Sequence, residues 1–380
     1  MRYPLKERYG GDILADRGVN VIPSINVKIG TKAVRNIKVA EYSDRTPVLM
    51  PLFVLRGAED GPILLLDAAV HGNELNGVEI VRKVVAKVDP EKLKGTLLGM
   101  PIVNMAAYNA GLRWDPLDQK DMNRIFPGDR NGSLTEQVAY TFFNKIAKNA
   151  DYIIDFHSAE YPEIFLPHAR IRKRDRSGRS LEMINAFGTD IVWEQKGSEG
   201  MFQVNAIKKG IPTITIEIGA GANVDREGIQ LGIRGVYNVM KVRGMIEGKA
   251  KIPEYQILIK KKRSWLRSPI GGIFETKIKL GKIVREGMQL GKIIDPLSYG
   301  EMELTSPVNG IVAGLRTHPV VRTGTRLFFL LEYKKVGGKF GIDPKHLIEV
   351  PQLPNSVYRK NRLLERIAEF ENGDESGHSH

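Results

Sequence analysis

Short apolar runs and amphipathic stretches alternate along the first part of the sequence. Within residues 20–66, apolar runs of strand length are separated by turn residues such as Gly57. Such runs predict the strands of a sheet. From Glu74 onward the pattern changes, because valines between residues 78 and 88 recur at helical intervals. The sequence therefore predicts a helix directly after these strands.

The same alternation continues to about residue 250. A polar loop runs to Pro127, and Ser133 with Glu136 then fits a capping box at the start of a helix. The elements predicted after residue 90 are a strand at 96–104, a helix at 133–150, a strand at 151–158, a long polar loop, a strand at 211–221 and a helix at 232–246. Alternating strands and helices indicate an α/β domain, which we place at residues 1–255.

The pattern differs again from Trp265 to Glu332, where glycines separate short β-like runs. Two stretches, GGIFETKIKLGKIVREGMQLGKI and NGIVAGLRTHPVVRTGTRLFFL, share the order glycine, strand, turn, Val-Arg-x-Gly, strand. This repeat predicts two similar hairpin halves of a small all-β domain, placed at residues 256–350. Residues 351–380 form a tail for which one charged helix and a frayed end are predicted.

Composition removes several kinds of chemistry. The 380 residues contain no cysteine, which excludes disulfides, thiolate metal ligands and cysteine nucleophiles. The net charge of +13 suits a nucleic-acid binder, but the basic clusters are not interleaved with aromatic residues. We therefore expect no nucleic-acid partner. No apolar run reaches the length of about 18 residues that a membrane helix needs, so we expect no membrane contact and a cytoplasmic location.

Two histidines and a glutamate carry the first chemical signal. His71 and Glu74 lie where an apolar strand ends and a helix begins, and Gly72 allows a tight turn between them. His157 ends another apolar strand, and Asp155 or another carboxylate could accept its second ring N–H. Each histidine alone is more often a structural residue. Together with Glu74, the pair predicts a divalent metal site with an open coordination position for water.

Such a site also needs a base and groups that bind the substrate. Glu217 closes a buried-type strand that opens into glycines, so it is the candidate base, and a buried salt bridge is the alternative. Arg113 and Arg124 lie in one loop, where a guanidinium can hold a carboxylate or stabilise an oxyanion.

Four motifs, HGNE, DMNRIFPG, DFHS and TIEIGAG, occur in an order that resembles the succinylglutamate desuccinylase/aspartoacylase family, a branch of the zinc carboxypeptidase fold. The likeness covers residues 45–335. It implies an α/β fold with a mixed sheet flanked by helices, one zinc ion per chain, and water activation by the base. The site residues that it implies are His71, Glu74 and His157 as zinc ligands, Glu217 as base, Arg113 as oxyanion-stabilising group, and Asn123 and Arg124 as the carboxylate-binding pair.

The β domain resembles the barrel-sandwich hybrid of biotinyl and lipoyl carriers. Those carriers need a lysine at the hairpin tip, whereas this chain has Glu301-Met302-Glu303-Leu304 there, so we expect no lipoylation or biotinylation. In related deacylases the domain leans over the active site, and the same is expected here.

The favoured function is a zinc-dependent deacylase that cleaves the amide bond of a small N-acylated amino acid or a related carboxylate. A metallocarboxypeptidase acting on peptides is the nearest alternative, and a non-catalytic binding protein for anionic ligands is the alternative from another class. The acyl group, the amine, formation of a homo-oligomer and the choice between zinc and another divalent ion stay open.

Overall fold

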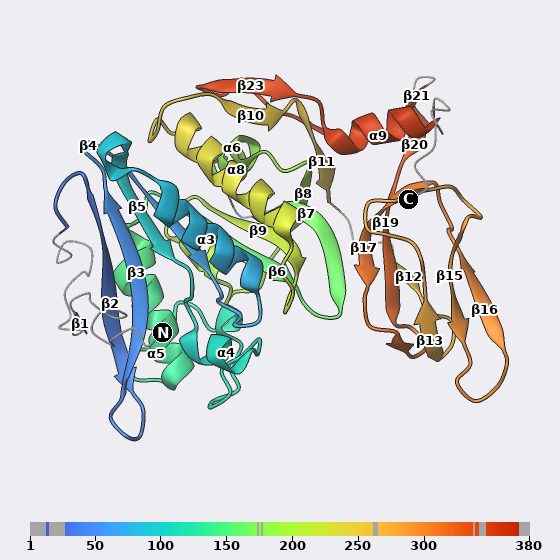
Figure 1. Cartoon of the computed structure of the whole chain (residues 1–380), viewed down its shortest axis with the longest axis horizontal. Helices are drawn as coiled ribbons and strands as arrows, with labels where there is room; N and C mark the ends of the chain where they lie inside the picture. The colour runs from blue at the N-terminus through green and yellow to red at the C-terminus, as the bar shows by residue number, and fades with distance from the viewer. Residues whose placement is uncertain are drawn as a thin grey trace, which may run out of the picture.

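The computed structural model describes residues 13–14, 27–172, 175, 178–260, 265–336, 339–341 and 347–371. Figure 1 shows a helix-flanked sheet at the N-terminal side of the chain and a β-rich module at the C-terminal side. Among the described residues, no helix is both long enough and apolar enough to cross a membrane.

Helices and strands follow one another along most of the described chain. The helices are α3 (Leu75–Lys87), α4 (Met105–Ala110), α5 (Leu134–Thr141), α6 (Arg179–Phe187), α7 (Phe202–Lys208), α8 (Arg226–Val242) and α9 (Arg362–Glu371), with the short turns η1 (Pro90–Lys92), η2 (Met122–Arg124), η3 (Phe142–Ile146) and η4 (Ala147–Asn149). The strands before residue 260 are β1 (Ile13–Leu14), β2 (Thr31–Glu41), β3 (Pro47–Arg56), β4 (Glu59–Ala68), β5 (Lys94–Met100), β6 (Tyr152–Ala159), β7 (Glu163–Arg172), β8 (Ile191–Gln195), β9 (Thr213–Ala220), β10 (Ala250–Pro253) and β11 (Tyr255–Ile259). The later strands are β12 (Trp265–Arg267), β13 (Gly272–Glu275), β14 (Ile283–Val284), β15 (Gln289–Ile294), β16 (Glu301–Thr305), β17 (Gly310–Arg316), β18 (Val320–Val321), β19 (Arg326–Glu332), β20 (Lys334–Val336), β21 (Lys339–Gly341), β22 (Leu347–Glu349) and β23 (Ser356–Arg359).

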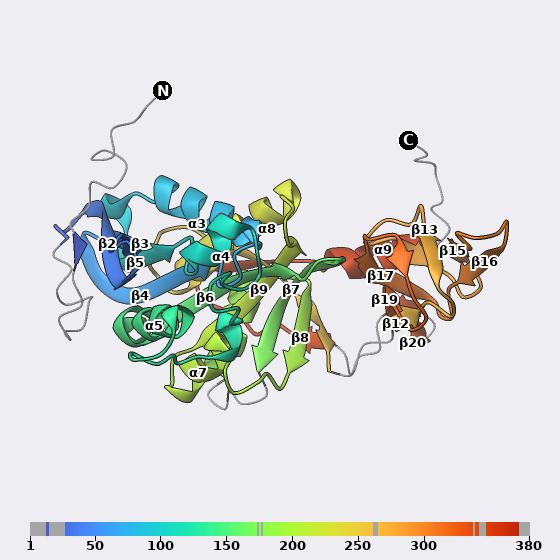
Figure 2. The same cartoon turned by 90° about the horizontal axis from the view of Figure 1, so that it is seen from below.

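The central sheet is mixed, with the strand order β1-β2-β3-β5-β4-β6-β9-β7 before it continues into the C-terminal module. Strands β5, β4, β6 and β9 are parallel neighbours, whereas β7 runs antiparallel to β9. Figure 2 shows helices α3 and α8 on one side of this sheet and α5 and α7 on the other. Because both faces are covered, the central strands are buried on both sides and need apolar residues at nearly every position.

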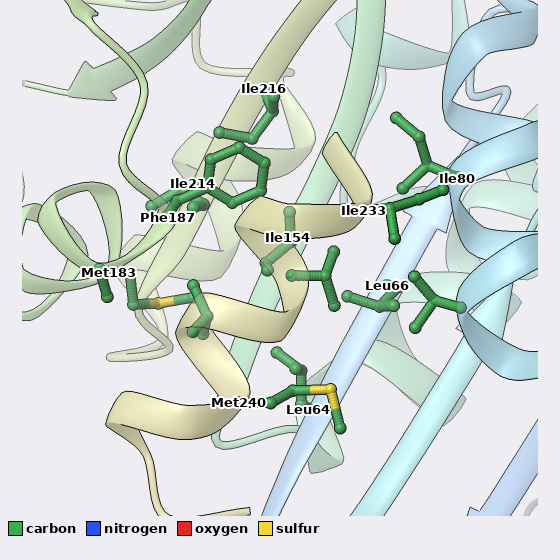
Figure 3. Packing of buried hydrophobic residues seen from close by; sticks show 14 of the residues in the cluster. Leu64, Leu66, Ile80, Ile154, Met183, Phe187, Ile214, Ile216, Ile233 and Met240 are labelled. Atoms are coloured by element: carbon green, nitrogen blue, oxygen red, sulfur yellow. The ribbon is translucent and has the colours of Figure 1, made fainter. Parts of the chain in front are cut away.

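Side chains of one strand therefore alternate between two cores. Leu64 and Leu66 of β4 pack with the residues of α3 and α8, whereas Leu65 packs into the opposite core with Phe142 and Phe202. Figure 3 shows the first core, in which Ile233 of α8 lies among the strand residues. This alternation explains why the strands read as continuous apolar runs in the sequence.

The C-terminal module is joined to the central sheet by strand pairing. β17 pairs antiparallel with the start of β7, with Gly314 opposite Phe165. The two parts also share an apolar cluster, in which the rings of Trp193 and Phe329 stack at 5.2 Å with 15° between their planes. A separate four-stranded sheet, β16-β15-β13-β18, completes the module. The described chain then returns to the α/β part, since β22 pairs with β11 and β23 with β10.

The predicted domain boundaries at residues 255 and 350 stay predictions. Strand pairing near both boundaries links the predicted domains to one another. β11, within the range predicted for the β domain, pairs parallel with β8 of the α/β part. The predicted tail contains β23 as well as the charged helix α9.

Most predicted elements are present, and one prediction is wrong. The strands at 96–104, 151–158 and 211–221 appear as β5, β6 and β9, and the predicted helices appear as α3, α5 and α8. The long polar loop predicted between residues 158 and 211 instead contains β7, α6, β8 and α7. Polar side chains such as Arg170 and Arg172 alternate with apolar ones along β7, but the prediction followed the high polar content of the whole segment and missed this strand pattern. Of the apolar runs predicted as strands within residues 20–66, the part before residue 27 lies outside the described residues.

Candidate metal centre and active site

The predicted site residues meet where parallel strands end at one edge of the sheet. His71 follows β4, His157 lies near the end of β6, and Glu217 lies near the end of β9. The register places His157 directly opposite Glu217 across the β6–β9 pair. Because the carboxyl ends of neighbouring parallel strands share one edge, residues far apart in sequence come together there.

The turn between His71 and Glu74 is compact. The backbone N–H of Glu74 donates to the carbonyl oxygen of His71 at 3.2 Å, and helix α3 begins at the next residue. Gly72 lies against the backbone of Ala107, where a Cβ atom would come within 2.0 Å of the carbonyl carbon. Only glycine fits this approach, so the turn is held tight by packing as well as by its hydrogen bond.

The carboxylate of Glu74 lies between two imidazole rings. Its Oε1 is 2.7 Å from Nδ1 of His71, and its Oε2 is 2.8 Å from Nδ1 of His157. All three side chains are buried, and one ligand-type atom from each lies within 4.8 Å of the others. The backbone N–H of Ser158 also donates to Glu74 Oε2 at 2.9 Å. The Nδ1 atoms of both histidines therefore face one carboxylate in a buried cluster.

The remaining ring nitrogens of both histidines face aspartates. Nε2 of His71 is 3.0 Å from Oδ1 of Asp121, and Nε2 of His157 is 3.1 Å from Oδ1 of Asp155. The Asp155 contact is the one that its position in the sequence suggested. Thr215 fixes this carboxylate from the other side by donating to Asp155 Oδ2 at 2.9 Å. A carboxylate on the outer nitrogen orients a metal-binding histidine and sets its tautomer, so the cluster fits a divalent metal.

Negative charge surrounds the two imidazoles of the cluster. Burial acts to raise the pKa of Glu74, but the adjacent His71 and His157 hold it well below its usual range. Burial acts to lower the pKa of His157, whereas Asp155 and Glu74 raise it well above its usual range. The protein thus places negative charge around the two imidazoles, which is the field that a bound cation needs.

Glu217 is buried beside the cluster and forms an ion pair. Nη1 of Arg170 is 3.0 Å from its Oε1, whereas its Oε2 has no hydrogen-bond partner among the described residues. Burial raises the pKa of Glu217, and the charge of Arg170 acts in the opposite direction. The buried salt bridge raised as an alternative is therefore present, and it occupies only one of the two carboxylate oxygens.

Arg113 lies in contact with the cluster. It is 14% exposed, and its Nη1 is 3.4 Å from Oε1 of Glu74. Its Nε and Nη2 donate to Oδ2 of Asp121 at 3.2 and 3.1 Å. Two donors on one carboxylate oxygen hold the guanidinium in a fixed orientation next to Glu74.

Asn123 and Arg124 differ in their placement. The amide nitrogen of Asn123 is 3.3 Å from Nε2 of His157, and its oxygen accepts the backbone N–H of Phe202 at 2.8 Å. Arg124 is exposed, and its Nη1 donates to the carbonyl oxygen of Asn123 at 2.9 Å. The structure brings Asn123 into the cluster and leaves the guanidinium of Arg124 at its solvent side.

Asp121 and Arg170 were not singled out in the sequence. Asp121 lies two residues before Asn123 in the DMNRIFPG motif, and Arg170 lies in a segment predicted to be a loop. The signal that could have found Arg170 is the alternation of polar and apolar residues in FLPHARIR. This alternation is typical of a strand, and it places Arg170 on the same face of the sheet as Glu217.

With this geometry described, comparison with known proteins decides the family. The profile of the Succinylglutamate desuccinylase/Aspartoacylase catalytic domain matches residues 60–243, which contain all of the predicted site residues. The chain belongs to the succinylglutamate desuccinylase/aspartoacylase family. This confirms the resemblance drawn from the four motifs.

Relatives in this family differ in their named substrates. The chain is 28% identical over 295 residues to the N-alpha-acetyl-L-2,4-diaminobutyric acid deacetylase of Halomonas elongata, covering 75% of this chain and 86% of that protein. It is 26% identical over 179 residues to the succinylglutamate desuccinylase of Ectopseudomonas mendocina, covering 42% of this chain and 51% of that protein.

Solved structures of family members share the fold. The succinylglutamate desuccinylase/aspartoacylase of Rhodobacter sphaeroides superposes with a TM-score of 0.70 at 25% identity, covering 81% of this chain and 98% of that one. The product-bound ectoine utilization protein EutE (DoeB) of Ruegeria pomeroyi gives 0.70 at 24% identity, covering 80% and 97%. The predicted fold class, a mixed α/β sheet with an added C-terminal β domain, is confirmed.

Proposed function

We propose that this chain is a zinc-dependent deacylase that hydrolyses the amide bond of a small N-acylated amino acid or a related carboxylate. The chain is a hydrolase of non-peptide amide bonds, like the deacetylase and desuccinylase it resembles. The observation that carries the proposal is the buried cluster in which both histidine Nδ1 atoms face Glu74 and both Nε2 atoms face aspartates.

His71, Glu74 and His157 would hold the zinc ion, one per chain. Two imidazoles and one carboxylate are a donor set that suits zinc and leaves a position open for catalysis. When bound, the metal supplies a Lewis acid that polarises the amide carbonyl and lowers the pKa of water. In our proposal Asp121 and Asp155 keep the two rings in the tautomer that presents Nδ1.

Glu217 is the proposed general base. It accepts a proton from the attacking water, whose oxygen bonds to the amide carbon, and it returns this proton to the nitrogen when the C–N bond breaks. Burial raises the pKa of Glu217 toward the range that serves a group with both roles. The Oε2 atom without a protein partner supports this assignment.

Arg113, Asn123 and Arg124 are the proposed substrate-binding groups. The guanidinium of Arg113, held beside Glu74, stabilises the oxyanion that forms during attack on the carbonyl. Arg124 at the solvent side binds the carboxylate of the substrate, with Asn123 next to it.

The test combines metal analysis with hydrolysis of a panel of N-acyl amino acids by the native protein and by Glu217→Gln. The native protein is expected to bind one zinc ion and to hydrolyse at least one substrate, and the substitution should lower kcat by about 10² to 10⁴. Glu182→Gln, on the exposed face of α6, is the matched control. Intact turnover in Glu217→Gln, or a native protein without stoichiometric metal, would refute the proposal.

Two alternatives remain distinguishable by the same panel. A metallocarboxypeptidase would release C-terminal residues from peptides faster than it cleaves N-acyl amino acids. A binding protein for anions would turn over nothing and would retain ligand after chelation. The cytoplasmic location, the absence of a nucleic-acid partner and the oligomeric state stay predictions from the sequence.

A further inference from the structure

One cavity lies apart from the His71, Glu74 and His157 cluster and shares no residue with it. It is a recess of about 690 Å³ between helix α8, strands β10 and β23, and the start of α9. Figure 1 shows these elements together at one side of the sheet. We call this cavity the basic recess, defined by Arg234, Lys241, Lys251, Arg359 and Arg362 with their neighbours.

The recess gathers positive charge. Seven lysines and arginines line it, against two carboxylates, Asp190 and Glu365. Asp190 is already paired, since Nη2 of Arg359 is 2.8 Å from its Oδ1. Arg234 and Arg362 form no ion pair with any described residue. Burial and then the neighbouring Arg362 and Arg359 lower the pKa of Arg234, which is the sign of guanidinium groups held close together. Such crowding is unfavourable until an anion enters.

The walls of the recess are fixed by hydrogen bonds to the backbone. Asn238 of α8 donates to the carbonyl oxygen of Lys251 and accepts its N–H, both at 3.1 Å. Arg359 also donates to the carbonyl oxygen of Gly188 at 3.1 Å, and Asn361 donates to that of Asp190 at 2.9 Å. The strands and the helix are thus held in place without a ligand, so binding would require little ordering.

The recess also has apolar surface. Leu231 and Tyr237, both partly buried, line it together with the lysines and arginines, and the buried Phe187 lies behind them. Its volume lies in the range of small-molecule sites, roughly 300 to 1,000 Å³. A single phosphate ion would fill little of this space, and a polynucleotide would need a groove that continues beyond it.

We propose that the basic recess binds a small phosphorylated organic molecule of nucleotide size. Arg234 and Arg362 contact the phosphate groups, and the partly buried Leu231 and Tyr237 receive the organic moiety. Arginine suits this role because its planar guanidinium donates two hydrogen bonds to phosphate oxygens. The site is independent of amide hydrolysis and makes no use of the metal-ligand cluster.

The test uses ADP as probe and isothermal titration calorimetry on the full chain at about 0.15 M salt. The double variant Arg234→Gln/Arg362→Gln removes two exposed side chains without ion pairs among the described residues, so the fold is retained. The matched control is Arg267→Gln/Arg322→Gln, which makes the same charge change in a second arginine-lined recess of the C-terminal module.

ADP is expected to bind the native chain with one site and to bind the first double variant at least about tenfold more weakly, a difference of about 1.4 kcal/mol. The control should bind like the native chain, and adenosine should bind far more weakly than ADP. Both variants should keep their hydrolase activity. No saturable ADP binding, an equal loss in the control, or tight binding of single-stranded RNA without binding of ADP would overturn the proposal.

Discussion

Asp121→Asn tests whether the carboxylate behind His71 supports the proposed metal site. Asp121 Oδ1 lies 3.0 Å from Nε2 of His71, and Oδ2 accepts both donated N–H groups of Arg113. Burial acts to raise the pKa of Asp121, but the hydrogen bond from His71 and the nearby positive charges hold it far below its usual range. The group is therefore a carboxylate, and the amide of asparagine removes its charge at almost constant shape.

The amide can replace only part of these contacts. Its single oxygen can accept a hydrogen bond from His71 or from Arg113, but not from both. Its NH₂ group then faces the other donor, and neither of these two groups has an acceptor. Loss of such a carboxylate behind a metal-binding histidine costs about 10- to 100-fold in metal affinity, or about 1.4 to 2.7 kcal/mol. We expect a loss in this range, with Asp155 still holding His157.

Zinc affinity is measured by competition with a chromophoric chelator. The matched control is Asp118→Asn in the same loop, where the carboxylate accepts hydrogen bonds from Ser133 and Thr135 at the start of α5. This control should lower the stability of the fold by about 1 to 2 kcal/mol and leave zinc affinity unchanged. A zinc affinity of Asp121→Asn within about twofold of the native value would refute the reasoning.

Three further predictions concern the same edge of the sheet. Chelation should abolish hydrolysis, and added zinc should restore it. Compared with protein in free zinc at about 1,000 times its Kd, the chelated protein should be less stable by about 4 kcal/mol. Gly72→Ala, whose Cβ would meet the backbone of Ala107, should cost about 3 kcal/mol in chemical denaturation, whereas Gly111→Ala, with open space around it, should cost about 1 to 2. Arg170→Gln should destabilise the fold by about 3 kcal/mol because the buried Glu217 loses its partner. In the double variant with Glu217→Gln the cost should be smaller than the sum, and strict additivity would contradict the ion pair.

The sequence predicted those strands that are buried on both faces and those helices that bury one face against the sheet. β4, β6 and β9 are covered on both faces, so their apolar runs are visible without knowledge of their neighbours. α3 and α8 show helical periodicity because one face of each packs on the sheet.

The strands and helices between β6 and β9 were not predicted because polar and apolar side chains are both buried there. β7 lies between β9, β8 and the C-terminal module, and its polar side chains are buried by partners that come from elsewhere in the chain. Arg172, for example, is buried yet polar, since it donates to Gln203 of α7 at 2.6 Å and to Gln195 of β8 at 3.3 Å. Because tertiary contacts satisfy these polar residues, the overall polarity of β7 resembles that of a loop even though polar and apolar positions alternate along it.

The same distinction separates the two aspartates behind the histidines. Asp155 precedes His157 by two residues on one strand, so local spacing places both on the same face, and the contact could be expected from sequence. Asp121 is 50 residues from His71, and Arg170 reaches Glu217 only through the pairing of β7 with β9. Neither contact has a local signature. The candidate ligands could be identified because His71 and Glu74 follow the end of one apolar strand and His157 lies near the end of another. The residues that orient them or balance their charge reach the site only through strand order and loop path. A search of related sequences for this site should therefore require an acidic residue at the position of Asp121 as well as the two histidines and the glutamate.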